Sequence, residues 1–359
     1  MRVQPIRAAV VGTGFMGRVH VDALRRLGVH VVGVAGSTRA KAEAAALAPA
    51  YDSFEALIRD ERVQVVHIAT PNHLHHAQAK AALEAGKHVV CEKPLAMSSE
   101  ESADLLDVAE RSGLVHAVNY NLRFYPLVQH LHGVIASGEL GELRLLTGHY
   151  LQDWLLRESD WNWRVDRSLG GPLRAVGDIG THWMDMTQFL SGLRITAVMA
   201  DLARFVESRD SREVDTEDAA SILLHYEGGA RGAVTVSQVS PGRKNQLAFE
   251  IDGSASSAAW SSEHPDELWI GHGDRASELL PRDPNLLNDE GRAASFVPGG
   301  HVEGYADTFR ALYRAVYAAV ADGRPGAGYP TFADGHDMML VMDAVRRSAG
   351  EGRWVHVER

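Results

Sequence analysis

The sequence has a single cysteine, Cys91, among 359 residues, so no intramolecular disulfide can form and a reducing compartment is indicated. Long apolar runs are also missing, since none approaches the roughly 20 residues that a membrane-spanning helix needs. The first residues, MRVQPIRAAVVGTG, lack the apolar core and small-residue cleavage site of a signal peptide. We therefore expect a soluble cytoplasmic protein.

Basic residues are not in excess, because 36 lysines and arginines stand against 47 acidic residues and the net charge is −11. Without a basic stripe, neither nucleic acid nor a membrane surface is expected as a partner. A hydrophobic content of 45% and a charged content of 23% are ordinary for a globular protein. The length favours two domains.

Short apolar runs alternate with helical patterns in the first third of the chain. Buried strands are predicted at Ile6–Val11, His30–Ala35, Val63–Ala69, Lys87–Cys91 and Leu114–Val118. Repeated strand–helix–strand units of this length predict an α/β fold with a right-handed, doubly wound parallel sheet of the Rossmann type. We place this domain at residues 1–122.

The pattern changes after residue 122 to longer alternating segments, which predict a C-terminal α+β domain with an open, mainly antiparallel sheet over residues 123–359. Residues 261–300 are rich in Gly, Pro, Asp and Ser and are expected to be loop-like. The closing helix at about 334–349 is a candidate for packing back on the first domain. An open sheet face would need covering, so a homodimer or homotetramer is expected.

The segment Gly12-Thr13-Gly14-Phe15-Met16-Gly17 follows a predicted strand and opens a predicted helix. In this context Gly12 permits a tight turn, Gly14 lets the backbone approach a pyrophosphate, and Gly17 allows close helix–strand packing. The helix N-terminus would then face the phosphates with its partial positive charge. The loop, including Phe15 and Met16, predicts a dinucleotide-binding site for NAD or NADP.

The cofactor type depends on the end of the second strand, where an acidic residue usually holds the adenosine ribose of NAD. Here the chain has Gly36-Ser37-Thr38-Arg39 instead. Ser37 and Thr38 can donate hydrogen bonds and Arg39 can supply charge to a 2′-phosphate. This favours NADP, although Arg39 could equally be a solvated residue at a helix start.

Three motifs occur in order along the chain: the glycine loop, Thr70-Pro71-Asn72-His73-Leu74-His75 with Cys91-Glu92-Lys93-Pro94-Leu95, and Gly177-Asp178-Ile179-Gly180-Thr181-His182-Trp183-Met184-Asp185. With them the whole chain resembles the glucose–fructose oxidoreductase / inositol dehydrogenase / rhizopine-catabolism family. The resemblance implies NAD(P)-dependent oxidation or reduction of a carbinol or ketone on a sugar or cyclitol. It also implies that Lys93, Asp178 and His182 meet at the substrate beside the nicotinamide.

The residue types support these roles. Asp178 and His182 are four apart and would share a helix face, where a carboxylate can orient an imidazole that moves a proton. Lys93 ends a strand at the carboxyl edge of the predicted sheet, which is where ligands bind in open α/β sheets. A helix-start Asp with a packed His is the alternative for the pair.

Further candidates come from the resemblance and from residue type. Thr70, Pro71 and Asn72 are expected to line the cofactor; His75 is placed with them but is also interpreted as a packing or loop residue. Glu92 is expected either to hold a cofactor ribose or to neutralise its surroundings. The candidate substrate-binding residues are Lys93, Asn121, Arg123, Trp163, Arg164, Asp178, His182 and Tyr305, with an aromatic staple of the loop as the alternative for Trp163.

No metal site is expected, because the histidines near residue 75 have no second set of ligands. Cys91 is interpreted as an inert core thiol. The sequence thus predicts an NAD(P)-dependent sugar or polyol dehydrogenase or reductase acting on CH–OH. An NAD-dependent glycosidase of the same fold and a non-catalytic dinucleotide-binding sensor are the alternatives.

Overall fold

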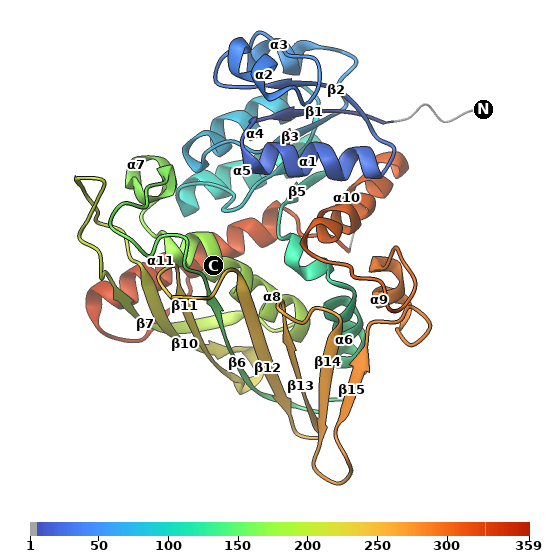
Figure 1. The fold of residues 1–359 in the computed structure, drawn as a ribbon, viewed down its shortest axis with the longest axis vertical. Coiled ribbons are helices and arrows are strands. Elements are labelled where there is room, and N and C mark those ends of the chain that lie inside the picture. Colours follow the sequence, from blue (N-terminus) through green and yellow to red (C-terminus); the bar gives the residue numbers. More distant parts are fainter. Residues whose placement is uncertain (1–5, 327) are drawn as a thin grey trace. The chain divides into compact units, whose positions relative to one another are not determined.

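The computed structural model describes residues 6–326 and 328–359. The chain forms two compact units: residues 1–121 with 306–339, and residues 122–305 with 340–359. The chain therefore leaves the first unit and returns to it. Each unit has a sheet of its own (Figure 1).

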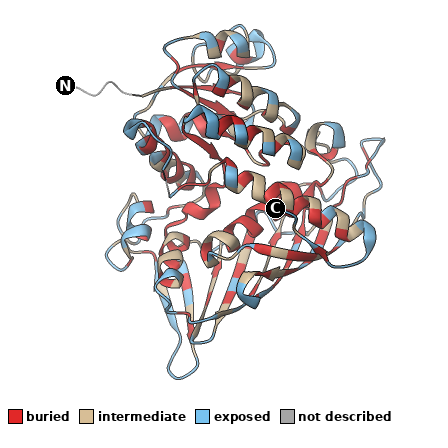
Figure 2. Cartoon of the chain, turned by 180° about the vertical axis from the view of Figure 1, so that it is seen from behind, coloured by how far each residue is buried: buried red, intermediate tan, exposed pale blue. Residues whose placement is uncertain are grey.

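The first unit has a five-stranded sheet in the order β2-β1-β3-β4-β5, with every neighbouring pair parallel, as the sequence predicts. Its elements are β1 (Arg7–Val11), α1 (Phe15–Arg26), β2 (His30–Ala35), α2 (Arg39–Ala45), α3 (Phe54–Arg59), β3 (Val65–Ile68), η1 (Asn72–Leu74), α4 (His75–Glu84), β4 (His88–Cys91), α5 (Ser99–Ser112), β5 (His116–Val118), α10 (Tyr305–Asp322) and the first part of α11 (Phe332–Glu351). Figure 2 shows these strands as buried and the outer faces of the helices as exposed.

Three helices of the first unit, α2, α3 and α5, begin at residues whose side chains cap them. The Ser98 hydroxyl accepts from the Glu101 backbone N–H at 3.2 Å, and the Glu101 carboxylate accepts from the Met97 N–H at 2.9 Å, so the two side chains together cap the start of α5. The Ser53 hydroxyl caps α3 by accepting from the Ala56 backbone N–H at 3.2 Å. Such caps satisfy backbone donors that the helix itself leaves unpaired.

The second unit has a nine-stranded sheet in the order β15-β14-β13-β12-β6-β11-β10-β7-β16. Its elements are η2 (Asn121–Phe124), α6 (Pro126–Ala136), β6 (Leu143–Leu151), η3 (Trp163–Val165), α7 (Arg167–Gly170), the π-helical turn η4 (Val176–Gly180), α8 (Thr181–Ser191), β7 (Ile195–Ala203), β8 (Ser208–Arg209), β9 (Arg212–Glu213), β10 (Ala219–Tyr226), η5 (Glu227–Gly229), β11 (Arg231–Ser237), β12 (Gln246–Gly253), β13 (Ser256–Ser261), β14 (Glu267–His272), β15 (Glu278–Pro281), α9 (Asp289–Ala294) and β16 (Val355–His356). Its pairs are antiparallel except β6 with β11.

The expectation of a loop over residues 261–300 is wrong, because β14, β15 and α9 lie there. In β14 the buried Leu268 alternates with exposed neighbours, but this signal is only a few residues long. The turn-forming residues that separate these short elements dominate the composition and conceal them.

The two faces of the second sheet differ. On one face Trp183 of α8 donates from its indole N–H to the Ala248 carbonyl at 3.0 Å. The strand register places four exposed apolar side chains on the opposite face, one on each of four strands: Leu145 (46% exposed), Leu223 (49%), Trp269 (37%) and Leu279 (60%). A face of this kind is typical of a surface that binds another protein chain.

Candidate active site

The glycine loop joins β1 to α1. At two of its glycines an added Cβ would clash with the backbone, and at the third it would have space. A Cβ on Gly12, whose φ is +106°, would lie 2.2 Å from the Ala69 carbonyl oxygen, and a Cβ on Gly17 would lie 2.0 Å from the Gly12 oxygen. A Cβ on Gly14 would meet nothing within 4 Å. The fold therefore requires two of the glycines, whereas the third leaves space for a ligand.

The first turn of α1 is suited to an anion. Gly14 is its N-cap, no side chain caps it, and no acidic residue lies in the first turn. Its first backbone N–H groups can thus donate to phosphate oxygens, aided by the helix dipole. Phe15 is 69% exposed beside this turn. The residues fit a dinucleotide pyrophosphate, as the sequence predicts.

Arg39, at the start of α2, is already paired with acidic residues. Its Nε donates to Glu43 at 2.8 Å and its Nη1 donates to Asp52. These hydrogen bonds to the two carboxylates raise the pKa of Arg39 above its usual value. Thr38 caps α2 by accepting from the Lys41 N–H at 3.2 Å. Ser37 is exposed.

The loop that follows β3 is held by His75, the first residue of α4. His75 is fully buried, with its Nε2 2.9 Å from the Thr70 carbonyl oxygen and its Nδ1 2.8 Å from the Pro94 carbonyl oxygen. The Thr70 hydroxyl also donates to Gln78 at 2.7 Å. Asn72 is buried, at 8% exposure. The residues at 70–72 and 93–94 therefore belong to two adjacent loops joined by one imidazole.

Glu92 and Lys93 follow β4 and differ in orientation. The Glu92 side chain is 6% exposed and points inward, where it accepts from His20 Nε2 at 2.9 Å and from the Asn119 amide. Burial raises the pKa of Glu92, but the hydrogen bond and charge of His20 and the charge of Lys93 outweigh burial, so the pKa lies below its usual value. Lys93 is half-buried, and its peptide bond to Pro94 is cis.

Behind Glu92 lies a buried polar chain that sequence analysis missed. His20 Nδ1 lies 3.1 Å from His67 Nδ1, and His67 Nε2 lies 3.0 Å from the Tyr317 hydroxyl. Burial first, and then the charge of His20, holds the pKa of His67 well below its usual value. His67 sits within an apolar strand and Tyr317 is 250 residues away, so no local pattern could reveal their contact.

The second group of candidates lies in the second unit, on η4 and α8. Asp178 lies in the π-helical turn, and π-turns of this kind occur frequently at functional sites. Its carboxylate accepts from Gln238 Nε2 at 2.8 Å and pairs with Arg164 Nε at 3.1 Å. His182 is in the first turn of α8 and is 8% exposed.

The structure brings three more side chains to this group. The Arg164 guanidinium lies over the Trp163 ring, 4.5 Å from its centroid. The Tyr150 ring lies 6.3 Å from the ring of His182, and Tyr150 donates to Asn245 at 2.8 Å. Burial first, and then the charges of Tyr305 and Asp178, raises the pKa of Tyr150 well above its usual value. The candidates Arg164, Trp163 and Tyr305 thus gather near Asp178. Tyr150 and Gln238 were not among the predicted site residues, because an alternating strand sequence does not distinguish them from their neighbours.

Two other candidates are engaged by neighbours in their own units. Asn121 is 2% exposed and donates from its amide to the Thr308 hydroxyl at 2.7 Å. Arg123 is 8% exposed and forms a two-pronged pair with Asp185, with Nε 2.7 Å from Oδ2. Both side chains therefore support the local structure around the site.

A buried acidic residue caps the turn that carries Asp178. Glu217 is 5% exposed and accepts from the backbone N–H groups of Arg174 and Val176 at 3.0 and 2.9 Å. Burial raises the pKa of Glu217 above its usual value. Beside it the fully buried Asp218 pairs with two arginines, Arg174 and Arg209. This ionic cluster fixes the start of η4.

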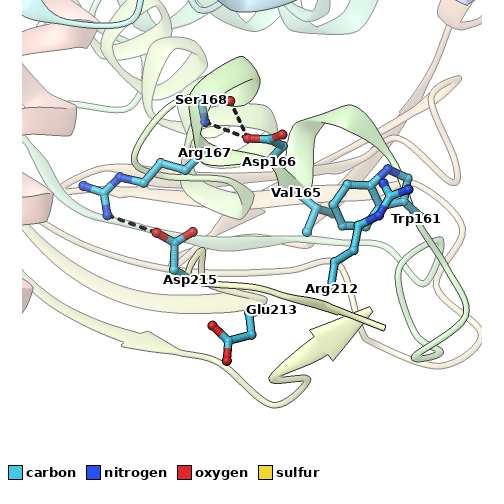
Figure 3. Close-up of a pocket in the computed structure, with 8 residues that line it drawn as sticks. All are labelled: Trp161, Val165, Asp166, Arg167, Ser168, Arg212, Glu213 and Asp215. Carbon is cyan, nitrogen blue, oxygen red and sulfur yellow. Dashed lines mark hydrogen bonds and ion pairs between the residues drawn. The ribbon is translucent and has the colours of Figure 1, made fainter. Parts of the chain in front are cut away.

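A separate open hollow of about 760 Å³ lies between the loop that contains η3 and the β8–β9 hairpin (Figure 3). Arg212 stacks on Trp161, 4.4 Å from its ring centroid, and Arg167 pairs with Asp215 at 3.5 Å. Neither Asp178 nor His182 lines this hollow. The other charged residues of its lining, Asp166, Arg212 and Glu213, are of both signs, so it shows no preference for a ligand of one sign.

Within residues 6–326 and 328–359, no group of three or more His, Cys, Asp or Glu side chains could hold a metal ion. Over the same residues no helix is long and apolar enough to cross a bilayer. Cys91 is fully buried, and burial raises the pKa of its thiol well above the usual value, as an inert core thiol requires.

Comparison with known families identifies both parts of the chain. A model of the oxidoreductase family with an NAD-binding Rossmann fold matches residues 6–120, and a model of the GFO/IDH/MocA C-terminal domain matches residues 128–259. Levoglucosan dehydrogenase of Pseudarthrobacter phenanthrenivorans is 32% identical over 99% of each chain. Glucose-6-phosphate 3-dehydrogenase of Bacillus subtilis is 26% identical over 94% of each.

Solved structures agree with these matches. Levoglucosan dehydrogenase in complex with NADH and L-sorbose superimposes with a TM-score of 0.93 at 31% identity, over 99% of this chain and 100% of that chain. An inositol dehydrogenase homolog from Azotobacter vinelandii, complexed with NAD⁺, superimposes with a TM-score of 0.89 at 30% identity, over 99% of this chain and 98% of that chain.

Proposed function

Because the chain belongs to the GFO/IDH/MocA family of NAD-binding oxidoreductases, we propose that it is an NAD(P)-dependent dehydrogenase or reductase of a sugar or cyclitol. The substrate class rests on the relatives, which are named for levoglucosan and glucose 6-phosphate. The observation that carries the proposal in this chain is the Asp178 carboxylate, held by Gln238 and Arg164 one turn before His182.

The bound nicotinamide would supply the hydride acceptor or donor at a secondary carbinol carbon. In the oxidative direction we assign proton removal from the substrate hydroxyl to His182, because imidazole exchanges protons near neutral pH. Asp178 orients that imidazole and favours its protonated form. Lys93 donates a hydrogen bond to the same oxygen and stabilises the charge that develops there.

We assign the sugar-contacting role to Trp163 and Arg164, with Tyr305 beside them. A planar ring can pack on the apolar face of a sugar, and a guanidinium can donate to its hydroxyls. Arg164 also pairs with Asp178, so a substrate hydroxyl that binds Arg164 would be placed near the proposed acid–base pair. In this proposal Arg123 and Asn121 contribute by holding their hydrogen-bond partners, Asp185 and Thr308.

We further propose that the protein accepts NADP as well as NAD. No acidic residue lies at the end of β2 to repel a 2′-phosphate, and the exposed Ser37 can donate to it. Arg39 would bind the 2′-phosphate by exchanging its present partners, Glu43 and Asp52, for this anion.

A homodimer or homotetramer is proposed through the exposed apolar face of the second sheet. Leu279→Glu on this face should lower the sedimentation coefficient without lowering the unfolding temperature of the protomer. Unchanged sedimentation would contradict the use of this face.

The test of the proposed activity is a panel of sugars and cyclitols with NAD and NADP, followed by absorbance of the reduced nicotinamide. With an active substrate, Lys93→Ala and His182→Ala should each lose kcat by at least about 10²-fold, the usual contribution of a proton-transfer group. Cofactor affinity, read by quenching of fluorescence, should stay within a few-fold. If both variants kept near-full kcat, the assignment would be wrong.

A further inference from the structure

His75 holds two loops of the first unit through both of its ring nitrogens. Its Nδ1 is 2.8 Å from the Pro94 carbonyl oxygen and its Nε2 is 2.9 Å from the Thr70 carbonyl oxygen. Both separations are within the range of an N–H···O hydrogen bond. The ring is fully buried, so water does not compete for these positions.

The chemistry of the two acceptors fixes the protons on the ring. A backbone carbonyl oxygen can only accept, and a neutral imidazole carries one N–H and one lone pair. A neutral His75 would therefore direct a lone pair at one of the two carbonyl oxygens, which is repulsive. Only the doubly protonated ring donates to Thr70 and Pro94 at once.

A buried imidazolium needs a nearby negative charge. The Glu92 carboxylate, also buried, supplies it: the charge of His75 is among the influences that keep the pKa of Glu92 below its usual value. The other titratable groups around this position are Cys91 and Lys93 on the same strand end as Glu92, and His20 of α1, which is bonded to Glu92.

Three ionisable groups of α4 and α5 are paired with each other. His76 Nε2 lies 2.6 Å from Asp104, and Lys80 lies 2.8 Å from the same carboxylate. Asp104 is therefore already engaged by His76 and Lys80, and Glu92 is the carboxylate that balances His75.

We propose that His75 is a protonated positioning residue that fastens the cofactor-lining loop at Thr70 to the loop that carries Lys93. Pro94 directly follows Lys93, so a hydrogen bond to its carbonyl restrains the backbone from which the lysine side chain extends. The proposal rests on the proposed function of Lys93, and it adds an alkaline limit to activity: loss of one ring proton removes one of the two hydrogen bonds and releases one loop.

The first experiment observes the ring directly. In protein labelled with ¹⁵N at its 18 histidines, the His75 signals are assigned as those missing from the His75→Gln spectrum. Protons on both ring nitrogens at about pH 7, above the usual histidine pKa of about 6.5, are expected. A neutral ring, with one protonated nitrogen between about pH 6 and about pH 8, would overturn the proposal.

The second experiment measures kcat, KM and the dissociation constant of the cofactor for His75→Gln, with His76→Gln as the control on the same helix. Glutamine has one amide nitrogen and cannot donate in both directions. The kcat should fall by about ten- to a hundredfold, as for loss of a hydrogen bond from a charged donor, with a smaller change in KM. The alkaline limb of the wild-type pH profile should be absent, while His76→Gln should keep the wild-type kcat and profile.

Unchanged kcat and pH profile in a folded His75→Gln protein would refute the role. If His75→Gln fails to fold, the wild-type spectrum still decides the protonation state, assigned instead with His75→Asn. If Lys93→Ala keeps its kcat, the proposed function fails. The spectrum remains a separate test of the doubly protonated ring.

Discussion

The glycine loop offers a pair of substitutions that separate cofactor binding from folding. In Gly14→Ala the new methyl group meets nothing within 4 Å, and the backbone has φ −74° and ψ −162°, which alanine adopts readily. In Gly17→Ala the methyl carbon would lie 2.0 Å from the Gly12 carbonyl oxygen, and both partners are backbone. The same chemical change should therefore have opposite effects at the two positions.

For Gly14→Ala we expect the free energy of unfolding without cofactor to stay equal or to rise by about 0.4–1 kcal/mol, because alanine restricts the unfolded chain. The methyl group would instead occupy the space of the pyrophosphate. Loss of one hydrogen bond to a charged phosphate costs about 1.5–3 kcal/mol, which corresponds to roughly ten- to a hundredfold in the dissociation constant.

For Gly17→Ala the backbone must move, and overpacking of this kind costs about 1–3 kcal/mol or more. The unfolding temperature should fall by several degrees, at about 2–4 °C per kcal/mol for a domain of 150–250 residues. Gly273→Ala, another open position with no positive φ, is the control for adding a methyl group.

The assay is thermal unfolding without cofactor together with fluorescence titration of NADH and NADPH. If Gly14→Ala bound both dinucleotides as tightly as the wild type, α1 would not be the pyrophosphate site. If Gly14→Ala unfolded at a lower temperature than Gly17→Ala, the structural distinction between the two glycines would be refuted.

Three further predictions follow from the pairing and burial of single side chains. Asp52→Asn frees Arg39 from one partner and should raise the ratio of kcat/KM for NADP over NAD by roughly tenfold, the effect of about 1.4 kcal/mol; an unchanged ratio would argue against a role for Arg39. Glu217→Gln keeps only one acceptor for the two N–H groups at the start of η4, so kcat should fall by about tenfold with cofactor affinity unchanged; equal losses of both would contradict a local effect. Burial lowers the pKa of His116 to about 4. The folded protein therefore binds this proton less readily than the unfolded chain does. The free energy of unfolding is highest above about pH 6.5 and falls by up to about 3 kcal/mol as the pH decreases towards 4. His116→Gln should weaken this acid dependence in denaturant titrations, and an unchanged slope would exclude His116 as its source.

The parallel sheet could be predicted from sequence because its signals are local. Each strand is a short apolar run buried on both faces, and helices such as α5 have a capping residue, Ser98, at the start and a stop glycine, Gly113, at the end. The short strands β14 and β15 and the helix α9 were missed because their own patterns span too few residues to stand out from the turns between them.

For the candidate site as well, the features that could be predicted are those carried by short segments of the sequence. The glycine loop and the spacing of Asp178 and His182 are local, so their residue types could be recognised directly. The partners that orient them are distant: Gln238 is 60 residues from Asp178, and Glu217 is 41 residues from the N–H that it binds at Val176. Such contacts depend on strand order and register, which one sequence does not encode in any short segment.

The return of the chain to its first unit has a consequence for synthesis and for dissection. The buried His67 of β3 bonds to Tyr317, and Asn121 bonds to Thr308, so the first unit obtains part of its interior from α10. On the ribosome its five strands therefore emerge well before the helix that completes them, and the intervening residues of the second unit are made in between. A fragment ending at residue 121 would expose the surface that α10 covers. The smallest independently folding cofactor-binding piece must join residues 6–121 to 306–339 by a linker, because no single cut in the chain can release it.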